Sequence, residues 1–563
     1  MNRQETLSHI KSNPSLDVLI VGAGINGIGV FRDLALNGVN TLIVDRGDFC
    51  SGASAASSHM AHGGIRYLEN GEFRLVREAV GERNRMIQNA PHLVSPLPTT
   101  IPVFRHFSGL FNAPLKFFGL LDRPGERGSI VIRIGLAFYD AFTGKTGTVP
   151  RHTFRGRAES RARWPRLNPN VVSTAEYYDG LIQNPERLAL EFLLDGTADG
   201  GRALNYVSLV KGEGDTVTLR DELTGSTFDL RPKLVVNAAG PWIDSANGRL
   251  GFSTRFIGGT KGSHLVLDHP ELRQAIGENE FFFENKDGRI VLIFPLFDKI
   301  LVGTSDIPVE DPGEIRCTED EVDYFLGMTA RVFPDIKIGR EHIVFRFSGV
   351  RPLAYANAKT AGQITRDHHI QVMEGDWTGL AYPVYSLVGG KWTSFRAFAE
   401  QATDKALAFL GRTRQTSTRA LPIGGGRNYP RTAEEQKRYL EGLAAWTGFS
   451  IERVQSLFSR YGTRAESVAL FLSKQPDAPL KSLPEYSRRE IAFLCLNEKV
   501  VHLDDLVLRR TMLAMLGRLT RPALQELAEA AGDSLGWDDA RKKAEAERAL
   551  DLLADRHGVR LGD

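Results

Sequence analysis

Residues 17–27 read Asp17-Val18-Leu19-Ile20-Val21-Gly22-Ala23-Gly24-Ile25-Asn26-Gly27, and the chain continues to Thr41-Leu42-Ile43-Val44-Asp45. An apolar strand runs into a Gly-x-Gly-x-x-Gly turn. A stretch with helical spacing of apolar residues follows, and a second apolar strand ends in an acid. This order within about 30 residues is typical of a strand–helix–strand unit that binds a dinucleotide. The sequence therefore predicts a Rossmann-like α/β domain at the start of the chain.

Each glycine of this motif, and the acid that follows it, has a physical role in binding a dinucleotide. Gly22 permits a tight turn, Gly24 lets a pyrophosphate approach the backbone, and Gly27 lets the helix pack closely on the strand. The helix N-terminus offers N–H groups to the phosphates. Asp45 follows the second strand and is placed to accept hydrogen bonds from a ribose diol. The motif alone leaves FAD and NAD open.

Composition limits the function classes. The chain has 563 residues, so we expect about two to four domains. It is 42% hydrophobic and 25% charged with a net charge of +2, which gives no reason to expect nucleic-acid binding. Cys50, Cys317 and Cys495 are far apart, which argues against a disulfide framework or a metal cluster. We predict no metal.

The polar N-terminus has no apolar core of a signal peptide, and no run of about 18 uncharged apolar residues occurs. We therefore expect a cytoplasmic protein, and any membrane contact would be peripheral, on the inner face of the cytoplasmic membrane. Residues 104–121 are aromatic and mildly basic, which fits a bilayer interface or an ordinary buried loop and helix equally well. A homodimer stays open.

Periodicity divides the chain. Residues 72–90 have a helical stripe, residues 204–236 alternate as strands, and residues 234–242 form an apolar strand that ends in small residues. Several short strands fill residues 263–304, with a hairpin signal at Asp287-Gly288. We predict a nucleotide-binding domain over 1–429 with an interleaved substrate domain (roughly 90–170 and 255–350), and a separate helical domain over 430–563.

Several blocks along the chain resemble the FAD-dependent glycerol-3-phosphate dehydrogenases. Beyond residues 22–45, the blocks are 57–69, 72–76, 237–242, Lys261-Gly262-Ser263-His264, 303–306, 348–353, 365–367, Gly389-Gly390-Lys391, Asp504-Asp505 and Arg509-Arg510-Thr511. They are collinear and cover nearly the whole chain.

The resemblance implies an FAD enzyme that oxidises sn-glycerol 3-phosphate to dihydroxyacetone phosphate and passes electrons to quinone at a membrane. It implies a glycine-oxidase-like FAD domain, an antiparallel β-rich substrate domain and an all-α C-terminal domain. The positions it places at FAD, besides the glycine turn and Asp45, are Ser54, Ser57, Ser58, His62, Gly63, Gly64, Ala239, Gly240, Gly389, Gly390 and Lys391.

This chain departs from the family pattern in three places. Ser57-Ser58-His59 stands where the family usually has Ser-Ser-Lys, Ile65 replaces a leucine, and the region 105–130 is longer. Another polyol phosphate such as erythritol phosphate therefore stays open as substrate. An oxidase that uses oxygen also stays open. A tRNA-modifying flavoprotein would be expected to have a basic stripe and reactive cysteines, and the sequence indicates neither.

Oxidation of a phosphorylated alcohol needs a proton acceptor, stabilisation of developing negative charge, and cations for the phosphate. We expect Arg351 and Lys391 near the reacting oxygen and the flavin, and Arg66, Tyr67 and Arg366 at the substrate, with both arginines on its phosphate. His62 is the leading candidate for general base, because imidazole titrates near neutral pH. A histidine that only contacts FAD or backbone is an equal alternative. His264 reads as structural.

Overall fold

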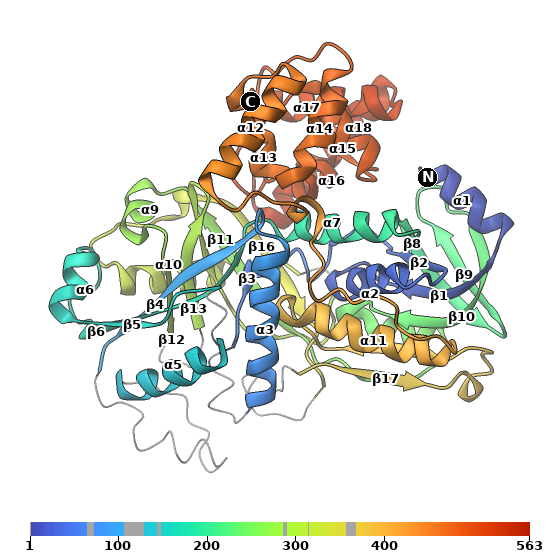
Figure 1. Ribbon diagram of the computed structural model, residues 1–563, viewed down its shortest axis with the longest axis horizontal. Helices are drawn as coiled ribbons and strands as arrows, with labels where there is room; N and C mark the ends of the chain where they lie inside the picture. Colours follow the sequence, from blue (N-terminus) through green and yellow to red (C-terminus); the bar gives the residue numbers. More distant parts are fainter. Residues whose placement is uncertain are drawn as a thin grey trace.

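The computed structural model describes residues 2–64, 72–105, 129–143, 148–284, 290–313, 315–355 and 367–562. Two β-sheets with helices packed on them form the lower body in Figure 1, and a group of helices sits above them. The fold is mixed α/β, as the sequence predicts.

The first sheet carries the glycine turn. Its strands are β1 (Ser15–Val21), β2 (Thr41–Val44), β7 (Arg202–Leu204), β8 (Val207–Glu213), β9 (Thr216–Asp221), β10 (Thr227–Asn237), β17 (His369–Met373) and β18 (Val384–Val388). The order is β17-β18-β10-β1-β2-β7. In addition, β9 pairs antiparallel with the first residues of β10, and β8 pairs antiparallel with β9. Strands β18, β10, β1, β2 and β7 run parallel, so their carboxyl ends meet at one edge. Ligands of such sheets bind at that edge.

Helices cover this sheet and supply its apolar core. They include α2 (Ile25–Leu36), α7 (Pro185–Ala198) and α11 (Phe395–Phe409), and α2 packs against both of the others. Ile28, Phe31 and Leu34 of α2 are fully buried between them. Residues from near the end of this part of the chain thus pack on the glycine-turn helix, since α11 lies beside α2 (Figure 1).

The second sheet lies beside the first. Its strands are β3 (Met60–Ala61), β4 (Val94–Val103), β5 (Thr153–Gly156), β6 (Ser173–Ile182), β11 (Thr260–Leu267), β12 (Glu280–Glu284), β13 (Ile290–Leu296), β14 (Lys299–Gly303), β15 (Ile307–Pro308) and β16 (Ile343–Arg351). The sheet was expected to be antiparallel, and one pairing differs: β12 runs parallel to β4. The predicted turn at Asp287-Gly288 lies outside the described residues, although β12 and β13 pair antiparallel on either side of it.

Further helices border the two sheets. They are α1 (Arg3–Ser12), α3 (Phe73–Asn89), α5 (Ser129–Thr143), α6 (Arg157–Arg163), α8 (Ile243–Arg249), α9 (Pro270–Ile276) and α10 (Glu319–Val332), with the short turns η3 (Gly240–Trp242) and η7 (Trp392–Ser394). The helix predicted over 72–90 is α3, and it packs against α5. None of the helices in the described ranges combines the length and the apolar character needed to cross a bilayer.

The C-terminal part is helical. Its elements are α12 (Ala433–Thr447), α13 (Ile451–Tyr461), α14 (Ala465–Ser473), α15 (Arg488–Asn497), α16 (Leu503–Asp505), the π-helical turn η10 (Leu506–Arg510), α17 (Arg521–Leu535) and α18 (Asp539–His557). Their apolar faces share one core with the second sheet, where Phe345 stacks on the His557 ring at 4.3 Å between centroids. The helical group therefore docks on the sheets rather than standing apart from them.

Glu280 is a buried acid in the second sheet whose titration gives a direct test of the packing. Its Oε2 accepts a hydrogen bond from the Thr99 hydroxyl at 2.7 Å, while Oε1 has no partner among the described residues. Burial raises the pKa of Glu280 from 4.5 to about 8. The folded protein thus keeps a proton that the unfolded chain releases, so this group makes stability fall as pH rises from about 4.5 to about 8.

Glu280→Gln should remove that dependence, because the amide mimics the protonated acid. Relative to the variant, the unmodified protein should lose up to about 1.4 kcal/mol of unfolding free energy per pH unit between pH 5 and 8. Urea unfolding at several pH values measures this. Parallel pH profiles for the two proteins would contradict the assignment.

Candidate functional site

The glycine turn joins β1 to α2 at the carboxyl edge of the first sheet. Gly22 has φ +103°, and a Cβ there would lie 2.6 Å from the Ala238 carbonyl oxygen. A Cβ on Gly27 would collide with the Gly22 carbonyl oxygen. Gly24 is the N-cap of α2 and has no side chain with which to cap the helix, and of the first N–H groups that of Ile25 donates to the Ser54 hydroxyl at 2.9 Å. This is the local geometry of a phosphate-binding helix terminus.

Asp45 closes the turn from the end of β2. Its Oδ2 accepts from the Ala23 N–H at 2.7 Å, and its Oδ1 accepts from the Gly47 N–H at 3.0 Å. Burial raises the pKa of Asp45 to about 6, against the two backbone donors that lower it. Each oxygen retains capacity for a second hydrogen bond, so a ribose diol can still be accepted.

The segment 54–64 crosses from the glycine turn to the second sheet. Ser54 accepts from the Ile25 N–H at 2.9 Å, and Ser57 accepts from the His59 N–H at 3.4 Å. The Ser58 hydroxyl lies 2.8 Å from His264 Nε2. The start of the segment is therefore fixed to α2, and its middle to β11.

His62 and Gly63 lie at the far end of that segment. The His62 N–H donates to the Thr393 hydroxyl at 3.0 Å, which ties it to η7. The Gly63 N–H is 3.0 Å from both the Tyr139 hydroxyl and Asp179 Oδ1, and Gly64 adopts φ +73°. Buried side chains of the second sheet and α5 thus set the backbone of these two glycines.

Gly389 and Gly390 form a turn that touches the glycine turn. Their φ values are +78° and +92°, and the Asn26 amide donates to the Gly389 carbonyl at 3.3 Å. A Cβ on Gly390 would lie 2.5 Å from Asn26 Nδ2. Lys391 follows with a buried Nζ and acts electrostatically on Glu78 of α3. The structure therefore places Lys391 toward α3.

Arg351 ends β16 in a different group of side chains. Its Nη2 donates to the Thr304 hydroxyl at 2.8 Å, and its Nη1 donates to the Ser305 carbonyl at 3.1 Å and pairs with Asp306 at 3.2 Å. A Cβ on Gly262 would collide with the guanidinium, so the glycine makes room for it. These contacts fix one edge of the fork while about a quarter of the side chain stays exposed (23%).

A buried carboxylate supports the turn that holds Arg351. Glu321 Oε1 accepts from the Ser305 and Ser263 hydroxyls at 2.5 and 2.8 Å, and Oε2 accepts from Lys261 Nζ at 2.8 Å. Burial would raise the pKa of Glu321, but Lys261 and the hydroxyl donors outweigh it and lower the pKa. The carboxylate stays ionised and fixes the position of Ser305.

His264 lies next to Arg351, which sequence reasoning did not anticipate. Its ring stacks on Phe347 at 4.8 Å, and its Nδ1 has no hydrogen-bond partner among the described residues. Burial is the main cause that holds the pKa of His264 well below its usual value, and the positive charge of Arg351 lowers the pKa further. The ring is therefore neutral. The Lys261–His264 motif was the available signal. Only the sheet shows that His264 lies opposite Gly303 of β14, next to the 304–306 turn that binds Arg351, so that Arg351 acts electrostatically on the ring.

Of the remaining predicted residues, some lie at the carboxyl edge of the first sheet and the others lie outside the described residues. Gly240 has φ +58° with open space where a Cβ would project, and it adjoins Ala239 after β10 at the same sheet edge. Arg66, Tyr67, Arg366 and residues 106–121 of the aromatic segment lie outside the described residues. Asn26, Thr393 and Trp392, whose indole donates to the Ser54 carbonyl at 3.0 Å, are functional neighbours that the sequence reasoning missed.

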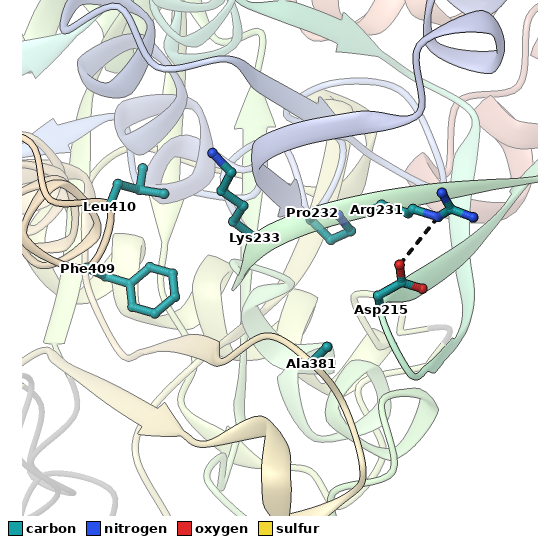
Figure 2. Close-up of a pocket in the computed structure, with 7 residues that line it drawn as sticks. All are labelled: Asp215, Arg231, Pro232, Lys233, Ala381, Phe409 and Leu410. Atoms are coloured by element: carbon teal, nitrogen blue, oxygen red, sulfur yellow. Dashed lines mark ion pairs between the residues drawn. The ribbon is translucent and has the colours of Figure 1, made fainter.

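A surface cleft of about 420 Å³ lies at the opposite end of the first sheet (Figure 2). Arg231 in its wall pairs with Ser15 at the amino end of β1, whereas the glycine turn follows the carboxyl end. Arg231 also pairs with Asp215 at 3.4 Å, and Lys233 with Asp17 at 2.9 Å. The cations of this cleft are already neutralised, so we assign it no part in the chemistry.

Comparison with known proteins agrees with this geometry. Residues 17–385 match the FAD dependent oxidoreductase family, and residues 416–542 match the C-terminal domain of alpha-glycerophosphate oxidase. The chain is 33% identical to a Synechocystis glycerol-3-phosphate dehydrogenase, over 93% of this chain and 94% of that protein. It is 29% identical to a mitochondrial glycerol-3-phosphate dehydrogenase of Arabidopsis thaliana, over 98% and 88%.

Among solved structures, the glycerol-3-phosphate dehydrogenase from Bacillus halodurans complexed with FAD matches with a TM-score of 0.74 at 22% identity, over 98% of this chain and 97% of that one. The L-alpha-glycerophosphate oxidase from Mycoplasma pneumoniae with FAD bound matches with a TM-score of 0.52 at 16% identity, over 72% and 98%. These two likenesses show the fold.

Proposed function

The chain belongs to the FAD-dependent glycerol-3-phosphate dehydrogenases, and on that premise we propose that it oxidises sn-glycerol 3-phosphate to dihydroxyacetone phosphate with quinone as electron acceptor. The observation that carries the proposal is the segment 54–64. Its Ser54 binds the helix that follows the dinucleotide turn, and its Ser58 binds His264, on which Arg351 acts electrostatically. We therefore place the cofactor and the substrate groups at one site.

The residues present fit FAD. The N-cap residue of α2 is Gly24, which has no side chain to block the helix terminus. Gly240 opens on free space, and Asn26 Oδ1 is a buried acceptor without a partner among the described residues. Such groups suit phosphates and the polar edge of a cofactor. Bound FAD supplies the acceptor for the hydride that leaves the alcohol carbon.

The protein's own residues orient the alcohol and manage its charge. We assign Arg351 to the reacting oxygen, because its guanidinium is held from one side by the 304–306 turn and is still partly exposed. Lys391 would lie on the α3 side of the flavin. Arg66, Tyr67 and Arg366 would hold the substrate, with the two arginines gripping its phosphate as fixed cations.

Two histidines compete for the proton of the hydroxyl. His62 is positioned through its backbone by Thr393, while His264 is neutral and offers an unpartnered Nδ1 in a buried site. A neutral imidazole is the form that accepts a proton. His62→Gln and His264→Gln should differ in the pH dependence of flavin reduction, and the variant that abolishes the ascending limb identifies the base.

Anaerobic flavin bleaching tests the function. The purified protein should show a bound-flavin spectrum that glycerol 3-phosphate bleaches and that unphosphorylated glycerol does not. A soluble quinone analogue should restore the colour faster than oxygen does. Bleaching only by a four-carbon polyol phosphate would move the substrate to erythritol phosphate, and faster recovery with oxygen would make the protein an oxidase.

We further propose that the protein contacts the inner face of the cytoplasmic membrane through α5. Ile134 and Phe138 are 56% and 53% exposed on the outer face of this helix, while Leu136 and Tyr139 are buried on its inner face. The helix begins soon after the aromatic segment 104–121. An apolar helix face of this kind can insert shallowly into a bilayer interface.

Ile134→Ser with Phe138→Ser should weaken binding to anionic phospholipid vesicles by about 10-fold, because two large apolar side chains no longer enter the interface. Vesicle cosedimentation measures this. Trp446→Ser is the matched control, since Trp446 is 60% exposed on α12 of the helical domain. Equal loss in both variants, or no loss in the first, would refute α5 as the contact.

A further inference from the structure

We propose that the C-terminal helical domain holds the nucleotide-binding loop Asp45–Cys50 in its binding conformation through Asp48, which makes Arg509 and Arg510 positioning residues for FAD. The proposal rests on the placement of FAD given above. It assigns to the helical domain a role in cofactor affinity, in addition to covering the second sheet.

Asp48 is a buried carboxylate with four donors. It is 1% exposed. Arg510 forks onto it, with Nη1 to Oδ2 at 2.6 Å and Nη2 to Oδ1 at 2.9 Å. Arg509 Nε donates to Oδ2 at 2.5 Å, and the Asn205 amide donates to Oδ1 at 2.9 Å. Two of these three partners come from the helical domain, so the loop is tied mainly to that domain.

The loop that carries Asp48 is also tied to the glycine turn, at positions on both sides of Asp48. Before it, Asp45 accepts from the Ala23 N–H. After it, the Cys50 N–H donates to the Ala23 carbonyl at 2.9 Å. Ala23 lies between Gly22 and Gly24, so a shift of Asp48 would disturb both hydrogen bonds that hold the centre of the phosphate-binding turn.

The helical domain presents its two arginines in a fixed orientation. Arg509 Nη2 donates to Asp505 at 2.7 Å, and Arg510 Nε donates to the Glu498 carbonyl at 3.0 Å. Glu498 in turn accepts a fork from Arg187 of α7 at 2.6 and 2.8 Å. Both guanidinium groups are therefore held by acceptors of the helical domain as well as by Asp48. Through Glu498 the hydrogen-bonded contacts extend from α7 to the loop.

The charge state fits this role. Burial would raise the pKa of Asp48, but Arg510 and Arg509 outweigh it and hold the pKa below its usual value. The group is thus an ionised carboxylate between two guanidinium groups. Removing its charge leaves two buried cations with one acceptor fewer, which favours opening of the interface at this point.

The test uses equilibrium titration of the full-length apoprotein with FAD, followed by flavin fluorescence. Asp48→Asn should raise the Kd for FAD about 10-fold, the size of a typical coupling between two sites. Glu490→Gln is the matched control. Glu490 is also fully buried between two arginines, Arg453 and Arg460, at 2.8 Å each, but all three lie inside the helical domain. It should lower thermal stability and leave the Kd unchanged.

Amide hydrogen exchange supplies a second readout. In the Asp48→Asn apoprotein, the amides of Ala23 and Cys50 should exchange faster while those in the centre of β1 should not change. By reciprocity, FAD added to the unmodified protein should slow exchange in α16 and η10. Arg510→Lys keeps the charge but loses the fork, and it replaces Asp48→Asn if that variant does not fold.

An unchanged Kd together with unchanged exchange at Ala23 and Cys50 would overturn the proposal. So would a Glu490→Gln protein whose FAD affinity falls as much as that of Asp48→Asn, because the effect would then follow general stability. If the unmodified protein bound no FAD, the proposed function would fail, and the exchange measurements on the apoprotein would still decide whether Asp48 holds the loop.

Discussion

Arg351→Ala should slow reduction of bound FAD by glycerol 3-phosphate about 10²- to 10³-fold, which is the cost of removing one preorganised donor from developing negative charge. FAD should remain bound, because Arg351 is held by the 304–306 turn, whereas the glycine turn is built from β1, α2 and Ala238. Anaerobic stopped-flow bleaching gives the rate, and the flavin-to-protein ratio gives retention. Arg351→Lys should recover only part of the rate, since lysine cannot form the fork.

Arg346→Ala is the control for this prediction. Arg346 lies on the same strand, and its guanidinium pairs with Glu319 at 2.6 Å, away from the 304–306 turn. In the Arg346→Ala variant, glycerol 3-phosphate should reduce the flavin at the same rate as in the unmodified protein. Loss of flavin from Arg351→Ala, or equal rates in the two alanine variants, would remove Arg351 from the reacting oxygen.

Gly27→Val should weaken FAD binding by about 100-fold or more. Any Cβ at this position collides with the Gly22 carbonyl oxygen and lies 3.1 Å from the Ala238 Cβ, so α2 must move away from the turn. Overpacking of this kind costs about 1–3 kcal/mol, and here the displaced element is the phosphate-binding helix terminus. Titration of the apoprotein with FAD measures the loss.

Gly248→Ala provides the comparison. Gly248 is an exposed residue of helix α8, and a Cβ there meets nothing within 4 Å. Its FAD affinity should equal that of the unmodified protein. A Gly27→Val protein that binds FAD normally would show that the glycine turn is not the cofactor site.

Much of the fold was predictable because it depends on local patterns. The run Val18–Val21 is a buried parallel strand, and such strands are apolar on both faces, so an unbroken run identifies them. The same holds for β2 and for the end of β10, and the 3.6-residue spacing identified α3 and the C-terminal helices. The parallel pairing of β12 with β4 was missed, because strand direction depends on partners about 180 residues apart.

The candidate site was only partly predictable. Gly22, Gly27 and Gly390 could be found from the sequence, because close backbone approach demands glycine whatever the rest of the chain does. His264 was read as structural, since a single histidine in a strand carries no sign of its neighbours. Only the folded protein shows it beside Arg351 and Ser58.

The sequence by itself determined that a dinucleotide binds at the end of β1, because that follows from a short motif. It also determined that this dinucleotide is FAD, because collinear blocks of residues identify the family. Tertiary structure alone decided which side chains hold that motif in place. Asp48 and Arg510 are 462 residues apart, and no local pattern relates them. Their contact exists because the helical domain docks against α7 and the loop that follows β2, and a buried carboxylate there requires cationic partners wherever in the chain they come from.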